Sequence, residues 1–105
     1  MARPISIVPS VLPADFSRLG EECVALEKAG VDRIQWDVMD GQFVPNLTFG
    51  PDVIASVRAQ VTVPFEAHLM VNTPELMLRP YVDAGCELLI IHAESTVHLH
   101  RTLGA

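Results

Sequence analysis

The segment AGVDRIQWD at residues 29–37 decides the fold, because it recurs in altered form as AGCELLIIH at residues 84–92. Each copy joins an Ala-Gly pair and an acidic residue to an apolar run that is typical of a β-strand. Glycine readily adopts the left-handed conformation that ends a helix, so each copy predicts a helix followed at once by a strand. The recurrence therefore predicts repeated β-α units with a parallel sheet.

Four short apolar runs are predicted to be strands: residues 5–10, 34–39, 65–70 and 88–93. The segments between them have helical patterns. The first helix is expected over residues 15–29, and the next two should begin at Pro51 and Pro74, since proline suits a first helical turn. Pro80 lies inside the third pattern and predicts a bend or an early end there. Residues 97–105 have the pattern of a fourth helix, so the chain holds about four β-α units.

A complete (β/α)8 barrel contains about 250 residues. The fold class predicted for these 105 residues is therefore α/β, with the chain forming about half of a TIM barrel. We expect residues 1–105 to be the N-terminal half of a single barrel domain that is truncated within its fourth helix.

Composition argues against several functional classes. The chain has 7 Lys and Arg against 13 Asp and Glu, a formal charge of −6, and so offers no basic cluster for a nucleic-acid backbone. No apolar run approaches the roughly 18 residues that a transmembrane helix needs, and the N-terminal residues lack a secretion-signal pattern. The two distant cysteines suit reduced thiols. We expect a cytoplasmic protein with no nucleic-acid or membrane partner.

Alternation along two predicted strands separates polar from apolar side chains. Gln35, Asp37 and Met39 share one face of the strand at residues 34–39, because successive side chains of a strand point to opposite sides. His68 and Met70 share the corresponding face of the next strand. The opposite faces are wholly apolar and suit contact with helices, so the polar faces are expected to point into the barrel.

Asp37 and His68 are expected at the C-terminal ends of adjacent parallel strands, where barrel active sites form. The recurring segment places His92 at the register of Asp37, and Ser10 closes the first strand at the same level. A carboxylate and an imidazole that converge suit cation binding or proton transfer. A hydrogen-bonded polar layer without catalytic function is the alternative interpretation.

Four motifs together resemble the ribulose-phosphate 3-epimerase family: PSVLPADF at residues 9–16, DVMDGQFVPN at 37–46, HLM at 68–70 and HLHRT at 98–102. The resemblance extends over the whole chain but covers only about the first half of the family's barrel. It implies a ribulose-phosphate-binding barrel of the pentose phosphate pathway that interconverts D-ribulose 5-phosphate and D-xylulose 5-phosphate. In this family one aspartate removes the C3 proton to give an enediolate, and a second aspartate returns a proton to the opposite face.

The resemblance also implies a role for each matching side chain. Asp37 would be a catalytic acid/base residue and a metal ligand, and His68 a metal ligand near the substrate. Ser10 would contact the substrate, while Met39 and Met70 would line the reacting centre. The implied cofactor is a divalent metal cation (Zn, Fe, Mn or Co) that stabilises the enediolate.

Two departures from the family pattern qualify this assignment. Gln35 stands where the family usually has a metal-binding histidine, and an amide oxygen is a weaker ligand than imidazole for a transition metal. Weakened metal binding is therefore expected. The family's second catalytic aspartate and its phosphate-binding loops have no counterpart in these 105 residues, so the chain by itself is predicted to be inactive.

The intact protein is thus predicted to be an isomerase that binds a small sugar phosphate and forms a homo-oligomer. One alternative is an epimerase for a hexulose 6-phosphate such as allulose 6-phosphate, because the same first-half motifs serve both reactions. The other is a non-catalytic half-barrel that self-associates through its unpaired apolar edges.

Overall fold

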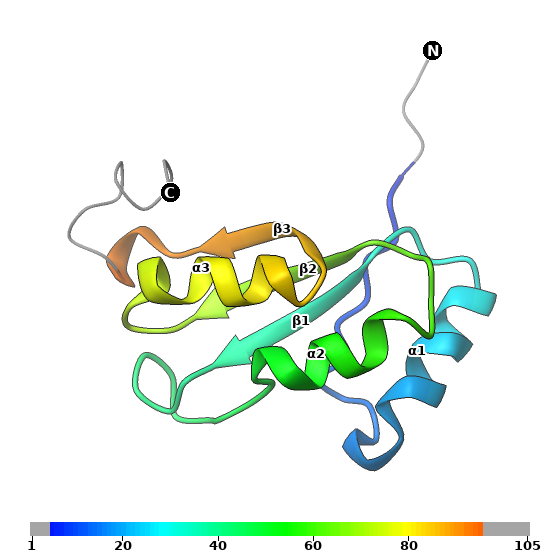
Figure 1. The fold of residues 1–105 in the computed structure, drawn as a ribbon, viewed down its shortest axis with the longest axis horizontal. Helices are drawn as coiled ribbons and strands as arrows, with labels where there is room; N and C mark the ends of the chain where they lie inside the picture. The colour runs from blue at the N-terminus through cyan, green and yellow to red at the C-terminus, as the bar shows by residue number, and fades with distance from the viewer. Residues whose placement is uncertain (1–4, 96–105) are drawn as a thin grey trace.

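The computed structural model describes residues 5–95. Its elements follow one another in the order η1, α1, β1, α2, β2, α3, β3 and η2 (Figure 1). Their bounds, in the same order, are Phe16–Arg18, Leu19–Lys28, Ile34–Met39, Pro51–Arg58, Phe65–Met70, Pro74–Asp83, Cys86–Ile91 and Ala93–Ser95. The three strands form one parallel sheet in the order β1-β2-β3, which confirms the predicted alternation of strands and helices.

Helices α2 and α3 lie along one face of the sheet, and α1 lies beside α2 (Figure 1). The side chains of β1 and β2 that point toward this helical layer are almost completely buried: Ile34, Trp36, Val38, Phe65, Ala67 and Leu69. Burying a large apolar side chain stabilises the fold by about 1.5–3 kcal/mol, so this layer is the main source of stability. The opposite face carries the half-buried side chains of Gln35, Asp37 and His68, and the predicted division of the two faces is confirmed.

The predicted strand at residues 5–10 is wrong as a regular strand. The segment runs beside β1 and forms an isolated parallel bridge between Ser10 and Gln35. In this bridge the Gln35 N–H donates to the Pro9 carbonyl at 2.9 Å, and the Val11 N–H donates to the Gln35 carbonyl at 3.1 Å. Extending the ladder toward the N-terminus requires an N–H group on residue 9, and proline has none.

Three other boundaries differ from prediction. The helix expected over residues 15–29 begins as the short η1 before α1 continues it, and β3 starts two residues earlier than the predicted run at 88–93. Helix α3 is not ended by Pro80 and continues to Asp83. Pro80 lies on the exposed side of the helix, where solvent can bind the carbonyl that loses its N–H partner. The predicted helix at residues 97–105 lies outside the described residues.

Gly30 and Gly85 end α1 and α3 as predicted. Their φ angles are 90° and 110°, in the region where a residue with a Cβ atom is strained. These two turns set where β1 and β3 begin, and so fix which residues reach the carboxyl edge of the sheet. Among the described residues, no helix has the length and apolar character needed to cross a membrane.

Candidate functional site

The candidate site lies at the carboxyl ends of β1 and β2. Asp37 is the register partner of His68, and Met39 is the partner of Met70 two residues further along the strands. The side chains of Asp37 and His68 are 14% and 24% exposed, so both are largely shielded but still reachable from the open face of the sheet. The predicted convergence of these two residues is confirmed.

The Asp37 carboxylate is fixed at both of its oxygen atoms. Ser10 Oγ donates a hydrogen bond to Oδ2 at 2.5 Å, and Gln35 Nε2 donates one to Oδ1 at 2.9 Å. Ser10 Oγ in turn accepts a hydrogen bond from the Leu12 N–H at 3.1 Å. Hydrogen bonds to an ionised group are stronger than neutral ones, so Asp37 is held in one orientation by Gln35 of its own strand and by Ser10 of the neighbouring segment.

His68 connects this carboxylate to a second imidazole. Its Nδ1 lies 3.3 Å from Gln35 Nε2 and 3.4 Å from Asp37 Oδ1. Its Nε2 lies 2.8 Å from Nε2 of His92, and the two rings stack with centroids 4.9 Å apart. The ring of Phe43, from the loop after β1, lies 5.3 Å from the His92 ring. Ser10, Gln35, Asp37, His68 and His92 therefore form one connected polar cluster.

Thr48, from the loop after β1, forms hydrogen bonds with the backbone at the C-terminal end of β1. Its hydroxyl donates to the Asp37 carbonyl and accepts a hydrogen bond from the Met39 N–H at 3.1 Å. The Thr48 N–H also donates to the Met39 carbonyl at 3.0 Å. These bonds hold the backbone from the Asp37 carbonyl to the Met39 carbonyl, while β1 still pairs with β2 over the same residues.

Asp40 organises the loop that follows β1. Its Oδ1 accepts the N–H groups of Gln42 and Phe43 at 2.8 Å each, and its Oδ2 accepts the Asn72 N–H at 2.8 Å. Partial desolvation acts to raise the pKa of Asp40, but these backbone donors together bring it below its usual value. Asp40 thus joins the loops after β1 and β2 to each other.

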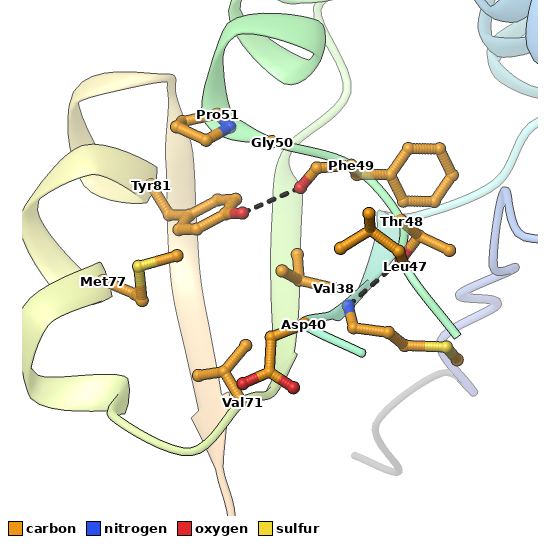
Figure 2. Close-up of a pocket in the computed structure, with 11 residues that line it drawn as sticks. Val38, Asp40, Leu47, Thr48, Phe49, Gly50, Pro51, Val71, Met77 and Tyr81 are labelled. Atoms are coloured by element: carbon orange, nitrogen blue, oxygen red, sulfur yellow. Dashed lines mark hydrogen bonds between the residues drawn. The ribbon is translucent and has the colours of Figure 1, made fainter. Parts of the chain in front are cut away.

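A hollow of about 420 Å³ opens on the helical side of the same strand ends, between the loop after β1 and helix α3 (Figure 2). The Tyr81 hydroxyl donates to the Phe49 carbonyl at 2.7 Å (Figure 2). Burial raises the pKa of Tyr81 to about 12, so it remains a neutral donor. Asp37 and His68 are not among the residues that line this hollow, so the hollow and the polar cluster lie on opposite faces of the sheet.

Cysteine chemistry has no support in the described part of the chain. Cys23 and Cys86 are free thiols and both are buried. Burial raises the pKa of each thiol to about 11, so neither forms the reactive thiolate at neutral pH. Buried thiols of this kind are inert structural groups.

The described residues do not assemble a metal centre from three charged or imidazole ligands. Within residues 5–95, no group of three His, Cys, Asp or Glu side chains is arranged to hold a metal ion. Asp37 Oδ1 and His68 Nδ1 are neighbours, and the third atom beside them is the amide nitrogen of Gln35. The predicted metal ligands are therefore together, and their metal binding stays a prediction.

Alternation along the two strands correctly placed Asp37 beside His68 and Met39 beside Met70. Ser10 contacts Asp37, although the strand that Ser10 was expected to close is not regular. The roles predicted for them stay predictions. Two features were missed, namely the attachment of β1 by Thr48 and the donor role of the Gln35 amide. The Thr48 contacts have no local signal in the sequence, because they join an irregular loop to backbone groups nine and eleven residues earlier. The Gln35 contact did have one, since Gln35 and Asp37 lie two residues apart on the same face of one strand. The histidines at positions 98 and 100 lie outside the described residues.

The parallel sheet and its polar cluster define an α/β protein built from successive β-α units, with a candidate acid/base site at the carboxyl edge of its strands. The chain belongs to the ribulose-phosphate 3-epimerase family, whose model matches residues 6–105. This finding confirms the resemblance that the motifs indicated.

Curated relatives come from bacteria and plants. The ribulose-phosphate 3-epimerase of Bacillus subtilis is 46% identical over 99 residues, which are 94% of this chain and 46% of the relative. That of Treponema pallidum is 45% identical over 105 residues, or 100% of this chain and 48% of the relative. The chloroplastic ribulose-5-phosphate-3-epimerase of Arabidopsis thaliana is 46% identical over 101 residues, or 94% and 36%. The chain spans about half the length of the bacterial relatives.

A more distant likeness concerns the fold alone. The carboxyl transferase domain of Rhizobium etli pyruvate carboxylase, in a structure with pyruvate, matches with a TM-score of 0.59 at 16% identity. The match covers 88% of this chain and 17% of that one. It agrees with the arrangement of parallel β-α units and carries no argument about activity.

Proposed function

We propose that the intact protein is a ribulose-phosphate 3-epimerase that interconverts D-ribulose 5-phosphate and D-xylulose 5-phosphate. The observation that carries the proposal is the Asp37 carboxylate, held by Ser10 and Gln35 beside His68 on the open face of the sheet. A base for carbon acids must be fixed within reach of the proton that it removes. Family membership supplies the substrate class, which the geometry alone does not identify.

In the proposed reaction, an Asp37 oxygen takes the proton from C3 of the sugar phosphate. The C3–H electron pair then forms the C2–C3 double bond, and the C2 carbonyl becomes the oxyanion of an enediolate. Ser10 and His68 would contact substrate oxygens, and Met39 with Met70 would shield the reacting carbons from water. A second aspartate, from outside these 105 residues, would return a proton to the opposite face of C3.

The family resemblance adds a divalent cation on Asp37 and His68, which would stabilise negative charge on the enediolate oxygens. The 3.4 Å between Asp37 Oδ1 and His68 Nδ1 suits two ligands bonded to one ion at about 2.1 Å. The third neighbour, Gln35 Nε2, offers hydrogen atoms and no electron pair. In this arrangement the residues do not complete a cation site, so no step of the mechanism is routed through one.

We propose further that the whole enzyme is a cytoplasmic, homo-oligomeric (β/α)8 barrel of the pentose phosphate pathway. This chain would contribute its N-terminal half. Since the phosphate-binding loops and the second acid/base residue would lie in the other half, the 105-residue chain alone should not epimerise sugar phosphates.

The test is Asp37→Asn in the protein at its natural length, with Asp52→Asn as the control. Asp52 lies in the first turn of α2, on the helical side of the sheet. Loss of a general base typically lowers the rate about 10²–10⁴-fold, and exchange of the C3 proton with deuterated solvent should fall with it. An Asp37→Asn enzyme within tenfold of the parent rate would refute the assignment of Asp37. Comparing kcat/KM for pentulose and hexulose phosphates decides between the two epimerase activities.

Exposed apolar side chains favour self-association as a second candidate function. Leu88 and Ile90 on β3 are 45% and 36% exposed, on the face that a closed barrel would cover. A free sheet face and edge of this kind promote pairing with another chain. Sedimentation of the 105-residue chain tests this idea, and a strictly monomeric species over micromolar concentrations would eliminate it.

A further inference from the structure

The atoms around Asp37 form a triangle with the dimensions of a metal site. Gln35 Nε2, Asp37 Oδ1 and His68 Nδ1 are separated by 2.9, 3.3 and 3.4 Å. Ligands bonded to one cation at about 2.1 Å lie roughly 3.0–3.4 Å apart in octahedral or tetrahedral geometry. The spacing of the three atoms therefore suits a cation. The amide nitrogen of Gln35 does not, because it is a hydrogen-bond donor without a free electron pair.

The hydrogen-bond partners fix which end of the Gln35 amide faces this triangle. With Nε2 inward, one amide hydrogen reaches the Asp37 carboxylate, and the same nitrogen lies beside His68 Nδ1. With the amide turned by 180°, Oε1 would lie against Asp37 Oδ1 with no hydrogen atom between two acceptors. Without a cation, the inward nitrogen is the arrangement that satisfies the carboxylate.

We propose that the Gln35 amide takes the place of a bound cation in this site. Its polarised N–H group lies against the carboxylate and beside the imidazole, and so holds Asp37 and His68 together without a metal ion. A cation could enter only after the amide had turned and the hydrogen bond to Asp37 had been broken. The chain should therefore bind divalent cations weakly, and a histidine at position 35 should restore tight binding.

The inference gives Gln35 a positioning role within the proposed function, but its test needs no substrate. Cation binding is measured on the protein at its natural length, with Mn²⁺ and with Zn²⁺ as separate probes. Isothermal titration gives the Kd, and elemental analysis after dialysis gives the metal-to-protein ratio. Loss of epimerase activity alone would bear on the proposed function, whereas these measurements bear on Gln35.

Gln35→His is the central variant, and Gln60→His is its matched control. Gln60 is exposed just beyond the end of α2, so the control adds an imidazole without altering the triangle. We expect the parent and the control to retain far less than one ion per chain. Gln35→His should retain about one and bind at least about tenfold more tightly.

A Gln35→Glu variant keeps the proposal testable if Gln35→His does not fold. It replaces the amide N–H group with a carboxylate oxygen, so the protein without metal should melt at a lower temperature and recover when Mn²⁺ is added. The parent Tm should be unaffected by Mn²⁺ or by a chelator. A parent protein that keeps one ion per chain through dialysis, with a Kd within tenfold of Gln35→His, would overturn the proposal.

Discussion

Thr48→Val tests whether the backbone around Asp37 is held from the loop that follows β1. The substitution keeps the shape of the side chain and replaces the hydroxyl group with a methyl group, which can form no hydrogen bond. Two backbone groups lose their partner, namely the carbonyl of Asp37 and the N–H of Met39. The hydrogen bond from the Thr48 N–H to the Met39 carbonyl is unaffected, so the loop should remain in place.

The expected magnitude follows from these two groups. A buried backbone group without a partner costs about 1–3 kcal/mol, and both bonds here are only partly buried. We take about 1 kcal/mol for each, which lowers the free energy of unfolding by about 2 kcal/mol. Because Asp37 lies at one of the two bonds, a small shift of its backbone should also lower kcat by roughly tenfold or more.

Urea unfolding followed by circular dichroism measures the first effect, and steady-state kinetics of the natural-length protein measures the second. Thr48→Ser retains the hydroxyl and serves as the control, with stability expected within about 1 kcal/mol of the parent. The reasoning fails if Thr48→Val unfolds within 0.5 kcal/mol of the parent, a difference of about the size seen for neutral surface changes. It fails equally if the serine variant is destabilised as much as the valine variant.

Two further predictions concern the same end of the sheet. Tyr81→Phe removes the buried hydrogen bond to the Phe49 carbonyl, so the free energy of unfolding should fall by about 1–2 kcal/mol in urea; an unchanged midpoint would contradict the assigned bond. Asp40 has a lowered pKa in the folded protein, so its stabilising effect is present above the pKa of the unfolded chain and is lost as the pH falls through the folded value. Asp40→Asn should therefore be less stable than the parent at pH 7, with the difference shrinking below about pH 4 in an acid titration followed by circular dichroism. A difference that stays constant down to pH 2 would exclude this linkage.

The bounds of β1 and β2 could be predicted to the residue, and in β1 two signals agree. In β1, a left-handed glycine ends the preceding helix, and every second side chain from Ile34 onward is apolar. A one-residue slip would place Trp36 on the open face and Asp37 among the helices. The burial pattern therefore fixes the register of β1, and the facing apolar residues of β2 fix its own.

Pairing partners decide the outcome where local signals are weak. Residues 5–10 are mostly apolar and run beside β1. Pro9 has no N–H group, so the ladder does not continue from Ser10 toward the N-terminus. Pro80 was expected to bend or shorten α3, but the carbonyl that it leaves without a partner lies on the exposed side of the helix. In both cases the effect of the proline depends on whether a backbone group that loses its hydrogen bond has another partner. The periodicity of the sequence carries no information about that partner.

The candidate site also contains residues that could be predicted from the sequence and residues that could not. Adjacent parallel strands bring residues at the same position along each strand together. Asp37 and His68 are each the fourth residue of their strand, so they could be placed next to each other from the sequence alone. Thr48 could not, because it comes from an irregular loop and contacts backbone groups that carry no side-chain identity. Its position shows that the loop after β1 supports the site as well as bordering it.

Gln35 shows why the residue type at a site does not settle its chemistry. The sequence has an amide where the resemblance to the family leads us to expect an imidazole, and that alone predicts only a weaker ligand. The structure shows that the amide nitrogen faces Asp37, because the carboxylate oxygen that it meets is an acceptor and Ser10 already supplies the hydrogen bond to the other oxygen. The Gln35 amide thus donates its N–H group to the Asp37 carboxylate in the absence of a cation. Its oxygen could bind a cation only if the amide turned. The balance between those two states is what the cation titration of the parent and of Gln35→His would measure.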